Sequence, residues 1–167
     1  MTAKSNSQAG ESAGTSTHRE PNLRQRILVV EDDALICQLN TEVLTYSGYQ
    51  VDAAEDGAAA WDALQRNSYD LVVTDNEMPK VTGVELIKKL QDARMNLPVI
   101  MATGKLPDEE FAHYPCLQPA VTLLKPYTFD ELLNAVKAVL RATADALEEI
   151  APPPNWQIPP PDNSFRL

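Results

Sequence analysis

Five short apolar segments recur along the chain, and a helical pattern follows each of them. Most are continuous runs of Val, Ile and Leu, which is typical of strands that are buried on both faces of a parallel sheet. The segments are 26–30, 50–54, 71–74, 98–102 and 121–124. Strands that alternate with helices predict an α/β fold, in which helices cover both faces of a doubly wound, five-stranded parallel sheet.

The helices between these strands are marked by apolar spacing and by capping residues. Thr82 and Glu85 have the spacing of a capping box, and so do Thr128 and Glu131. Three prolines between residues 107 and 119 leave room only for a short or irregular fourth helix. The predicted helices are 34–46, 57–66, 83–93, 108–113 and one from about 129 that continues to about 150.

We expect one folded domain over residues 25–142, with the last helix extended over 143–150. Residues 1–24 are mostly small and polar, so burial cannot offset the entropy of ordering them, and we expect disorder there. Residues 151–167 contain six prolines and predict an extended, disordered, polyproline-like tail.

The chain is acidic, with a formal net charge of −10. Lys88 and Lys89 are its only adjacent basic pair, so we expect no nucleic-acid binding, which requires clustered Lys and Arg. The two cysteines suit a reducing compartment. No segment approaches the roughly 20 apolar residues of a membrane helix, and the N-terminus lacks a secretory signal, so we expect a cytoplasmic protein.

Reactive side chains stand at the carboxyl ends of four predicted strands. Glu31 and Asp32 follow the first strand, Asp75 the third, Thr103 the fourth and Lys125 the fifth. In an open parallel sheet these ends meet at one edge, where ligands bind. Carboxylates brought together there repel each other, by about 4 kcal/mol at ~4 Å and an effective dielectric of about 20. The cluster therefore requires a cation, and its hard oxygen ligands favour Mg²⁺.

The same residues suit phosphoryl transfer. Asp75 is the predicted nucleophile, which would form an acyl phosphate. Lys125 offers a positive charge to a phosphoryl oxygen, and Thr103 offers a hydrogen bond to another. Together with Mg²⁺ these groups neutralise a transferring phosphoryl group, which is most of what such a reaction needs.

These motifs, in this order and at these spacings, resemble a response-regulator receiver domain of two-component signalling, of the single-domain type. The motifs are Val-Val-Glu31-Asp32-Asp33, Asp75-x-x-Met78-Pro79, Thr103 and Lys125-Pro126. The resemblance covers about residues 25–142 and implies a flavodoxin-like fold with the strand order 2-1-3-4-5.

The resemblance also implies roles for the acidic residues. Asp75 would be the phosphoacceptor, supplied by a histidine kinase or a histidine phosphotransfer protein. Asp32 and Asp75 would bind Mg²⁺ directly, together with the backbone carbonyl of Glu77, while Glu31 would act through water. Asp33 is expected only to cap the helix that follows.

Thr103 and Lys125 would contact the phosphoryl group and transmit its arrival to the opposite face. The sequence departs from the family there. Gly104 follows Thr103 where a small residue such as Ala is usual, and Thr122 stands where an aromatic residue often lies. With the proline-broken fourth helix, these departures predict a remodelled signalling face.

We therefore expect a stand-alone response regulator that signals through a protein contact whose affinity depends on phosphorylation. Its downstream partner is not indicated by the sequence, which also leaves a homodimer open. It would be no enzyme beyond catalysing its own phosphorylation and dephosphorylation.

Two other functions are compatible with parts of the pattern. A phosphatase with an aspartyl nucleophile would also need Mg²⁺ and a lysine, but its nucleophile normally lies on the first strand in an Asp-x-Asp-x-Thr motif, which residues 31–35 do not match. A pseudo-receiver would be a phosphorylation-independent binding module. Such domains usually lose an acid or the lysine, whereas both are present here.

Overall fold

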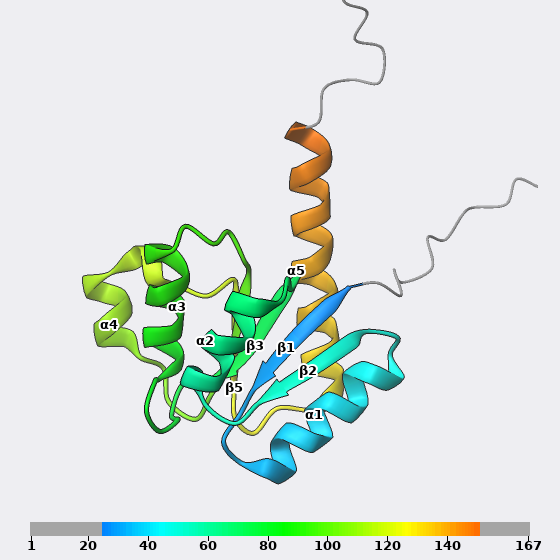
Figure 1. The fold of residues 1–167 in the computed structure, drawn as a ribbon, viewed down its shortest axis with the longest axis horizontal. Coiled ribbons are helices and arrows are strands. Elements are labelled where there is room, and N and C mark those ends of the chain that lie inside the picture. The colour runs from blue at the N-terminus through cyan, green and yellow to red at the C-terminus, as the bar shows by residue number, and fades with distance from the viewer. Residues whose placement is uncertain (1–24, 151–167) are drawn as a thin grey trace, which may run out of the picture.

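The five strands form one parallel sheet in the order β2-β1-β3-β4-β5, as predicted. A computed structural model describes residues 25–150, so the predictions for 1–24 and 151–167 lie outside the described residues. Figure 1 shows the sheet with its strands running in one direction. The strands are β1 (Arg26–Val30), β2 (Gln50–Ala54), β3 (Leu71–Asp75), β4 (Val99–Thr103) and β5 (Val121–Leu124).

The helices begin and end within a residue of the predicted positions. They are α1 (Ala34–Tyr46), α2 (Gly57–Arg66), α3 (Gly83–Asp92), α4 (Asp108–His113), the 3-10 turn η1 (Pro115–Leu117) and α5 (Phe129–Ile150). Asp33 caps α1, because its Oδ1 accepts hydrogen bonds from the amides of Leu35 and Ile36. The capping box that starts α3 is present, and Ala93, predicted as helical, is its C-cap.

Strands β3 and β4 reach one residue further toward their carboxyl ends than the sequence predicted. Asp75 pairs with Ala102, and Thr103 pairs with Leu124, so pairing with the neighbouring strand extends each strand by one residue. At the other end Pro98 lies outside β4 because it has no N–H to donate. Its carbonyl still accepts a hydrogen bond from the Val72 amide, at 3.1 Å.

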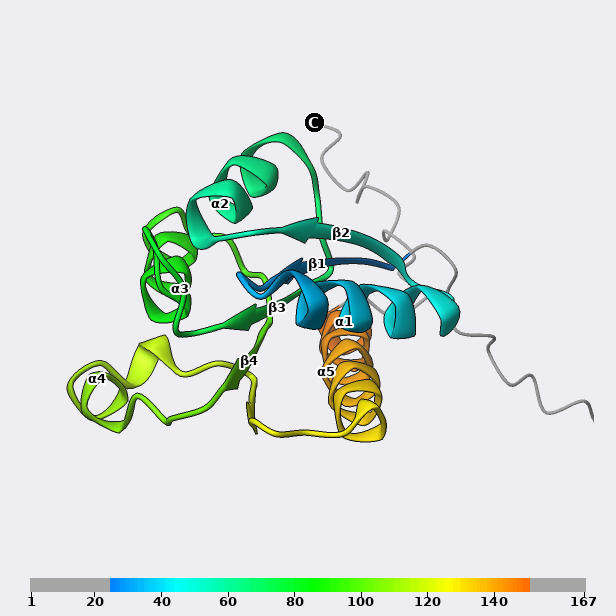
Figure 2. The ribbon, with the colours of Figure 1, turned by 90° about the horizontal axis from the view of Figure 1, so that it is seen from below.

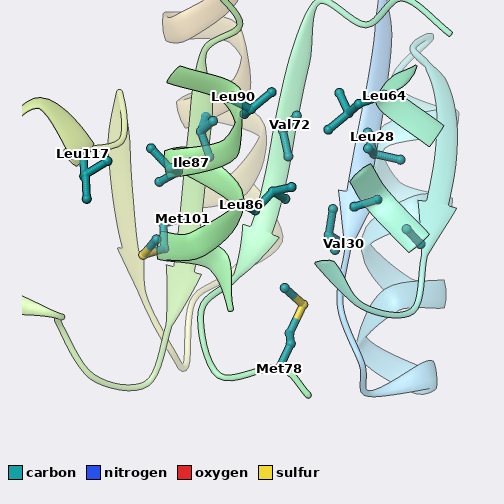
Figure 3. Close-up of a cluster of buried hydrophobic side chains, with 13 residues drawn as sticks. Leu28, Val30, Leu64, Val72, Met78, Leu86, Ile87, Leu90, Met101 and Leu117 are labelled. Atoms are coloured by element: carbon teal, nitrogen blue, oxygen red, sulfur yellow. The ribbon is translucent and has the colours of Figure 1, made fainter. Parts of the chain in front are cut away.

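The sheet separates two hydrophobic clusters. Figure 2 shows α1 and α5 on one face and α2 and α3 on the other. Side chains alternate along each strand, so Val72 joins the cluster under α2 and α3 while Val73 joins the cluster under α1 and α5. Figure 3 shows the first of these clusters. Burial on both faces explains the continuous apolar character of the three central strands.

The fourth helix is short, as predicted. Helix α4 ends at His113 and η1 follows it, with Leu117 buried in the cluster under α2 and α3. The Gln91 side chain of α3 donates a hydrogen bond to the Cys116 carbonyl and so attaches η1 to α3. At the adjacent edge of the sheet, β5 leaves Leu124 53% exposed.

Helix α5 is the longest helix of the described residues and extends beyond the sheet (Figure 1). Within residues 25–150, none of the helices combines the length and the apolar character that crossing a bilayer requires.

Candidate functional site

The register of the sheet brings the predicted reactive residues to one level. Val30 pairs with Thr74, which sets Glu31 beside Asp75 at the end of the neighbouring strand. The pairing of Thr103 with Leu124 likewise sets Lys125 just past Thr103. We call this edge, where all five strands end, the carboxyl edge of the sheet.

Asp75 is buried at this edge, and both of its carboxylate oxygens have partners. Its Oδ1 accepts hydrogen bonds from the backbone amides of Asn76, at 2.6 Å, and Glu77, at 3.2 Å. Its Oδ2 accepts a hydrogen bond from Lys125 Nζ at 2.9 Å. These bonds hold the carboxylate in a defined orientation, and the Asp75 side chain is only 8% exposed.

Lys125 joins two carboxylates across the site. Its Nζ lies 2.8 Å from Glu31 Oε2 and 2.9 Å from Asp75 Oδ2. Burial would lower the pKa of Lys125, but the hydrogen bonds to the two carboxylates outweigh burial and raise it above the ordinary lysine value. For Glu31, burial dominates and raises the pKa, and the contact with Lys125 only partly offsets that effect. The lysine is thus cationic at neutral pH and partly compensates two buried acids.

The acidic cluster fits a divalent cation. Glu31, Asp32 and Asp75 each place one carboxylate oxygen so that the three atoms lie within 4.8 Å of one another. Glu31 and Asp75 are buried, whereas Asp32 is exposed and leaves the cluster open to solvent on one side. Hard oxygen donors with room for water are the ligands that Mg²⁺ prefers. The residues present therefore match the predicted metal.

Thr103 and Glu77 lie at the carboxyl edge but differ from the other site residues. The Thr103 hydroxyl is fully buried and donates a hydrogen bond to the Lys105 carbonyl at 2.8 Å, within its own loop. The Glu77 side chain is exposed, and it is the Glu77 backbone amide that contacts Asp75. The predicted roles of Thr103 on the phosphoryl group and of the Glu77 carbonyl on the metal stay predictions.

The segment after Asp75 is folded tightly back on the strand end. The Gly83 amide donates to the Asn76 carbonyl at 3.2 Å, and the Val84 amide donates to the Asn76 side chain at 3.1 Å. A Cβ atom at Gly83 would collide with the carbonyl oxygen of Asp75. A glycine is therefore required for α3 to start this close to the candidate nucleophile.

No sequence pattern indicated a contact that supports Lys125. The buried side chain of Asn40, on α1, donates a hydrogen bond to the Tyr127 hydroxyl at 2.8 Å. Tyr127 stands two residues after Lys125, so this bond attaches the loop between β5 and α5 to α1. The two residues are 87 positions apart, and no local pattern links them. An asparagine among the apolar positions of α1 is the only signal that the sequence offered.

The chain is similar in sequence to known proteins. Residues 27–137 match the family described as the response regulator receiver domain. The chain is 34% identical over 121 residues to the response regulator MprA of Mycobacterium sp. strain KMS, and this match covers 71% of this chain and 52% of that protein. It is 35% identical over 133 residues to the alkaline phosphatase synthesis transcriptional regulatory protein PhoP of Bacillus subtilis strain 168. This match covers 78% of this chain and 52% of that protein.

A solved structure shares the fold. The response regulator TrrA of Thermotoga maritima, in complex with Mg²⁺-BeF, matches with a TM-score of 0.60 and 31% sequence identity, over 69% of this chain and 98% of that chain. The present chain spans about half the length of the curated relatives it matches.

Proposed function

The chain belongs to the response regulator receiver domain family, and we propose that Asp75 is its phosphoacceptor. One observation carries the proposal. The Asp75 carboxylate lies 2.9 Å from the Lys125 ammonium and shares an acidic cluster with Glu31 and Asp32. A nucleophile, a lysine and candidate metal ligands thus meet at the carboxyl edge of the sheet, where open α/β sheets bind ligands.

The proposed step is an in-line displacement at phosphorus. A carboxylate oxygen of Asp75 forms a bond to phosphorus while the bond between phosphorus and the donor breaks, and the electron pair of that bond leaves with the donor. The product is an acyl phosphate on Asp75. Lys125 exchanges its contact with the Asp75 carboxylate for one with a phosphoryl oxygen, so its charge follows the negative charge that arrives. The backbone amides of Asn76 and Glu77 hold the other carboxylate oxygen in place.

Mg²⁺ would be held by Asp32 and Asp75, with Glu31 acting through water and the Glu77 carbonyl as a further ligand. The oxygen-only donor set and the family support this assignment. When bound, the ion supplies positive charge to the transferred phosphoryl oxygens. Asp32 is the exposed member of the cluster, so the ion can reach the cluster from solvent on that side.

The donor that we propose is a histidine kinase or a histidine phosphotransfer protein. An apolar pocket of about 480 Å³ lies beside Lys125 and could receive the donor's surface. Its lining includes Leu39 of α1 and Phe129 of α5, which are 38% and 46% exposed. A docked donor would shield the reacting phosphoryl group from water.

We further propose that output is a protein contact that depends on phosphorylation, with no catalytic turnover beyond the chain's own phosphorylation and dephosphorylation. PhoP is named as a transcriptional regulator, and it extends beyond the part that matches this chain. A stand-alone mode of action and the absence of nucleic-acid binding therefore stay predictions.

The deciding experiment is the intact mass of the full chain after incubation with acetyl phosphate and Mg²⁺. We expect one phosphoryl adduct on the wild-type chain and none on Asp75→Ala. Asp62→Ala is the matched control, because Asp62 is an exposed aspartate of α2, and it should be modified like the wild type. Omitting Mg²⁺ should suppress the adduct.

A folded wild-type chain that takes no phosphoryl group under these conditions would contradict the proposal and favour a phosphorylation-independent binding module. An adduct that persists on Asp75→Ala would place the acceptor elsewhere. Sustained hydrolysis of small phosphate esters would instead favour an aspartyl phosphatase.

A further inference from the structure

The loop between β3 and α3, residues 76–82, carries the backbone groups that contact Asp75. We call it the phosphoacceptor loop. Its far end is tied to another helix by an ion pair between Lys80 Nζ and Asp56 Oδ2, at 2.5 Å. We propose that Lys80 and Asp56 are positioning residues that hold this loop in the conformation the metal and the phosphoryl group require. The inference rests on the proposed function of Asp75.

Asp56 divides its two carboxylate oxygens between two tasks. Its Oδ1 caps α2 by accepting hydrogen bonds from the amides of Ala58, at 2.9 Å, and Ala59, at 2.8 Å. Its Oδ2 receives Lys80. The Asp56 side chain is 3% exposed, while that of Lys80 is 63% exposed. The pair therefore joins a buried carboxylate at the start of α2 to an exposed lysine on the loop, unlike an ordinary surface ion pair.

The backbone at Lys80 is strained. Its φ is 66°, in the left-handed region that a residue with a Cβ seldom occupies. Such a conformation persists only where surrounding contacts impose it. The ion pair with Asp56 is a contact of the Lys80 side chain that can do so.

Two other observations show that the phosphoacceptor loop packs closely beside α2. A Cβ atom at Gly57, the first residue of α2, would collide with the carbonyl oxygen and side chain of Val81. Met78 is buried in the same cluster as Ala60 and Leu64 of α2 and lies at the edge of the group of side chains in Figure 3. The start of α2 thus packs against the loop, and the ion pair between Lys80 and Asp56 attaches the loop to it.

The other end of the same loop is the candidate site. The amides of Asn76 and Glu77 donate to Asp75 Oδ1, and the Glu77 carbonyl is the proposed backbone ligand of Mg²⁺. Lys80 is three residues from Glu77, so a relaxed backbone at Lys80 changes the direction of the groups around Glu77. Residues that orient metal ligands affect metal affinity although they do not touch the ion.

The test compares Lys80→Met with Lys88→Met. Both variants remove one exposed lysine charge, but Lys88 lies on the outer face of α3. The Mg²⁺ dissociation constant is measured from the backbone amide NMR shifts of residues 75–78 in the full chain. We expect Lys80→Met to weaken Mg²⁺ binding about tenfold, the lower end of the effect of losing a ligand-orienting residue. The Mg²⁺ dissociation constant of Lys88→Met should stay within about twofold of the wild-type value. Lys80→Arg keeps the positive charge and should retain most of the wild-type affinity.

Charge and position act in opposite directions, which makes the result decisive. Removal of a positive charge would by itself tighten the binding of a cation. Tighter or unchanged binding in Lys80→Met would therefore overturn the positioning role. If the wild-type chain bound no Mg²⁺, the proposed function would fail, and this inference with it. If the wild type bound Mg²⁺ and Lys80→Met bound it equally well, only this inference would fail.

Discussion

Lys125 is the residue on which the electrostatics of the site depend most directly. It contacts the buried carboxylates of Glu31 and Asp75, and Asp32 adds a third acid to the same cluster. Charges that leave water must be compensated nearby, or they destabilise the folded state. The proposed Mg²⁺ ion and Lys125 therefore perform overlapping tasks, since each neutralises these acids.

This overlap predicts that Mg²⁺ compensates for the loss of the lysine. Without Mg²⁺, Lys125→Met should lower the free energy of unfolding by about 1–3 kcal/mol, since it leaves buried acceptors without their cation. Addition of Mg²⁺ should stabilise this variant more than the wild type. Urea unfolding with and without Mg²⁺ measures both effects.

Lys137→Met is the control for this prediction, because Lys137 is exposed on α5 and remote from the cluster in sequence. It should change neither quantity. A Lys125→Met variant as stable as the wild type in the absence of Mg²⁺ would show that the buried acids need no cation.

Among the elements, α5 is positioned from its first turn, close to the loop that carries Lys125. Glu131 Oε2 accepts hydrogen bonds from the Thr128 amide at 2.6 Å and the Thr128 hydroxyl at 2.9 Å, and the Glu131 amide returns a bond to that hydroxyl. Tyr127 and Leu132 join the same hydrophobic cluster around this capping box. The start of the helix is therefore specified locally.

The capping box predicts a pH dependence. The bond from the Thr128 amide, and then that from its hydroxyl, lowers the pKa of Glu131. A carboxyl whose pKa is lowered by folding stabilises the protein above its unfolded pKa of about 4.3, and this stabilisation is lost as the pH falls through the folded value. The stability difference between the wild type and Glu131→Gln should therefore shrink as the pH falls from about 6 to about 3.

Urea unfolding across that pH range tests the prediction. A Thr128→Ala background should reduce the pH dependence without abolishing it, because the backbone amide still donates. A difference between the wild type and Glu131→Gln that stayed constant with pH would mean that the charge of Glu131 does not contribute.

At the scale of the whole domain, the two hydrophobic clusters share the central strands. Val72 and Val73 are neighbours in β3, yet they belong to opposite clusters. A strand cannot lose its packing on one face and keep its position on the other. The domain should therefore unfold as one cooperative unit.

Substitutions in the two clusters should consequently have parallel effects. Leu86 of α3 and Leu132 of α5 are both fully buried, one in each cluster. Leu86→Ala and Leu132→Ala should each lower the free energy of unfolding by about 2–5 kcal/mol, with a single transition and an unchanged urea slope. Methyl NMR signals of the two clusters should disappear at the same urea concentration. Loss of one set before the other would contradict a single cooperative unit.

Local sequence patterns were sufficient for the elements and for grouping four of the candidate site residues. The strands and helices agree with prediction within a residue at most ends, because apolar periodicity, prolines and capping residues act over a few positions. Glu31, Asp32, Asp75 and Lys125 could be assigned to one cluster for a related reason. Each follows a strand, and all parallel strands end at the same edge.

The precise contacts of the site depended on packing between segments distant in sequence. Asn40 meets Tyr127 across 87 residues, and Asp56 meets Lys80 across 24. Neither pair lies within one element, so no periodicity could indicate it. The same holds for the place of η1 beside α3, where the Gln91 side chain meets the Cys116 carbonyl across 25 residues. A sequence pattern reports which face of an element is apolar, but the partner of a polar side chain depends on which elements the completed sheet brings together.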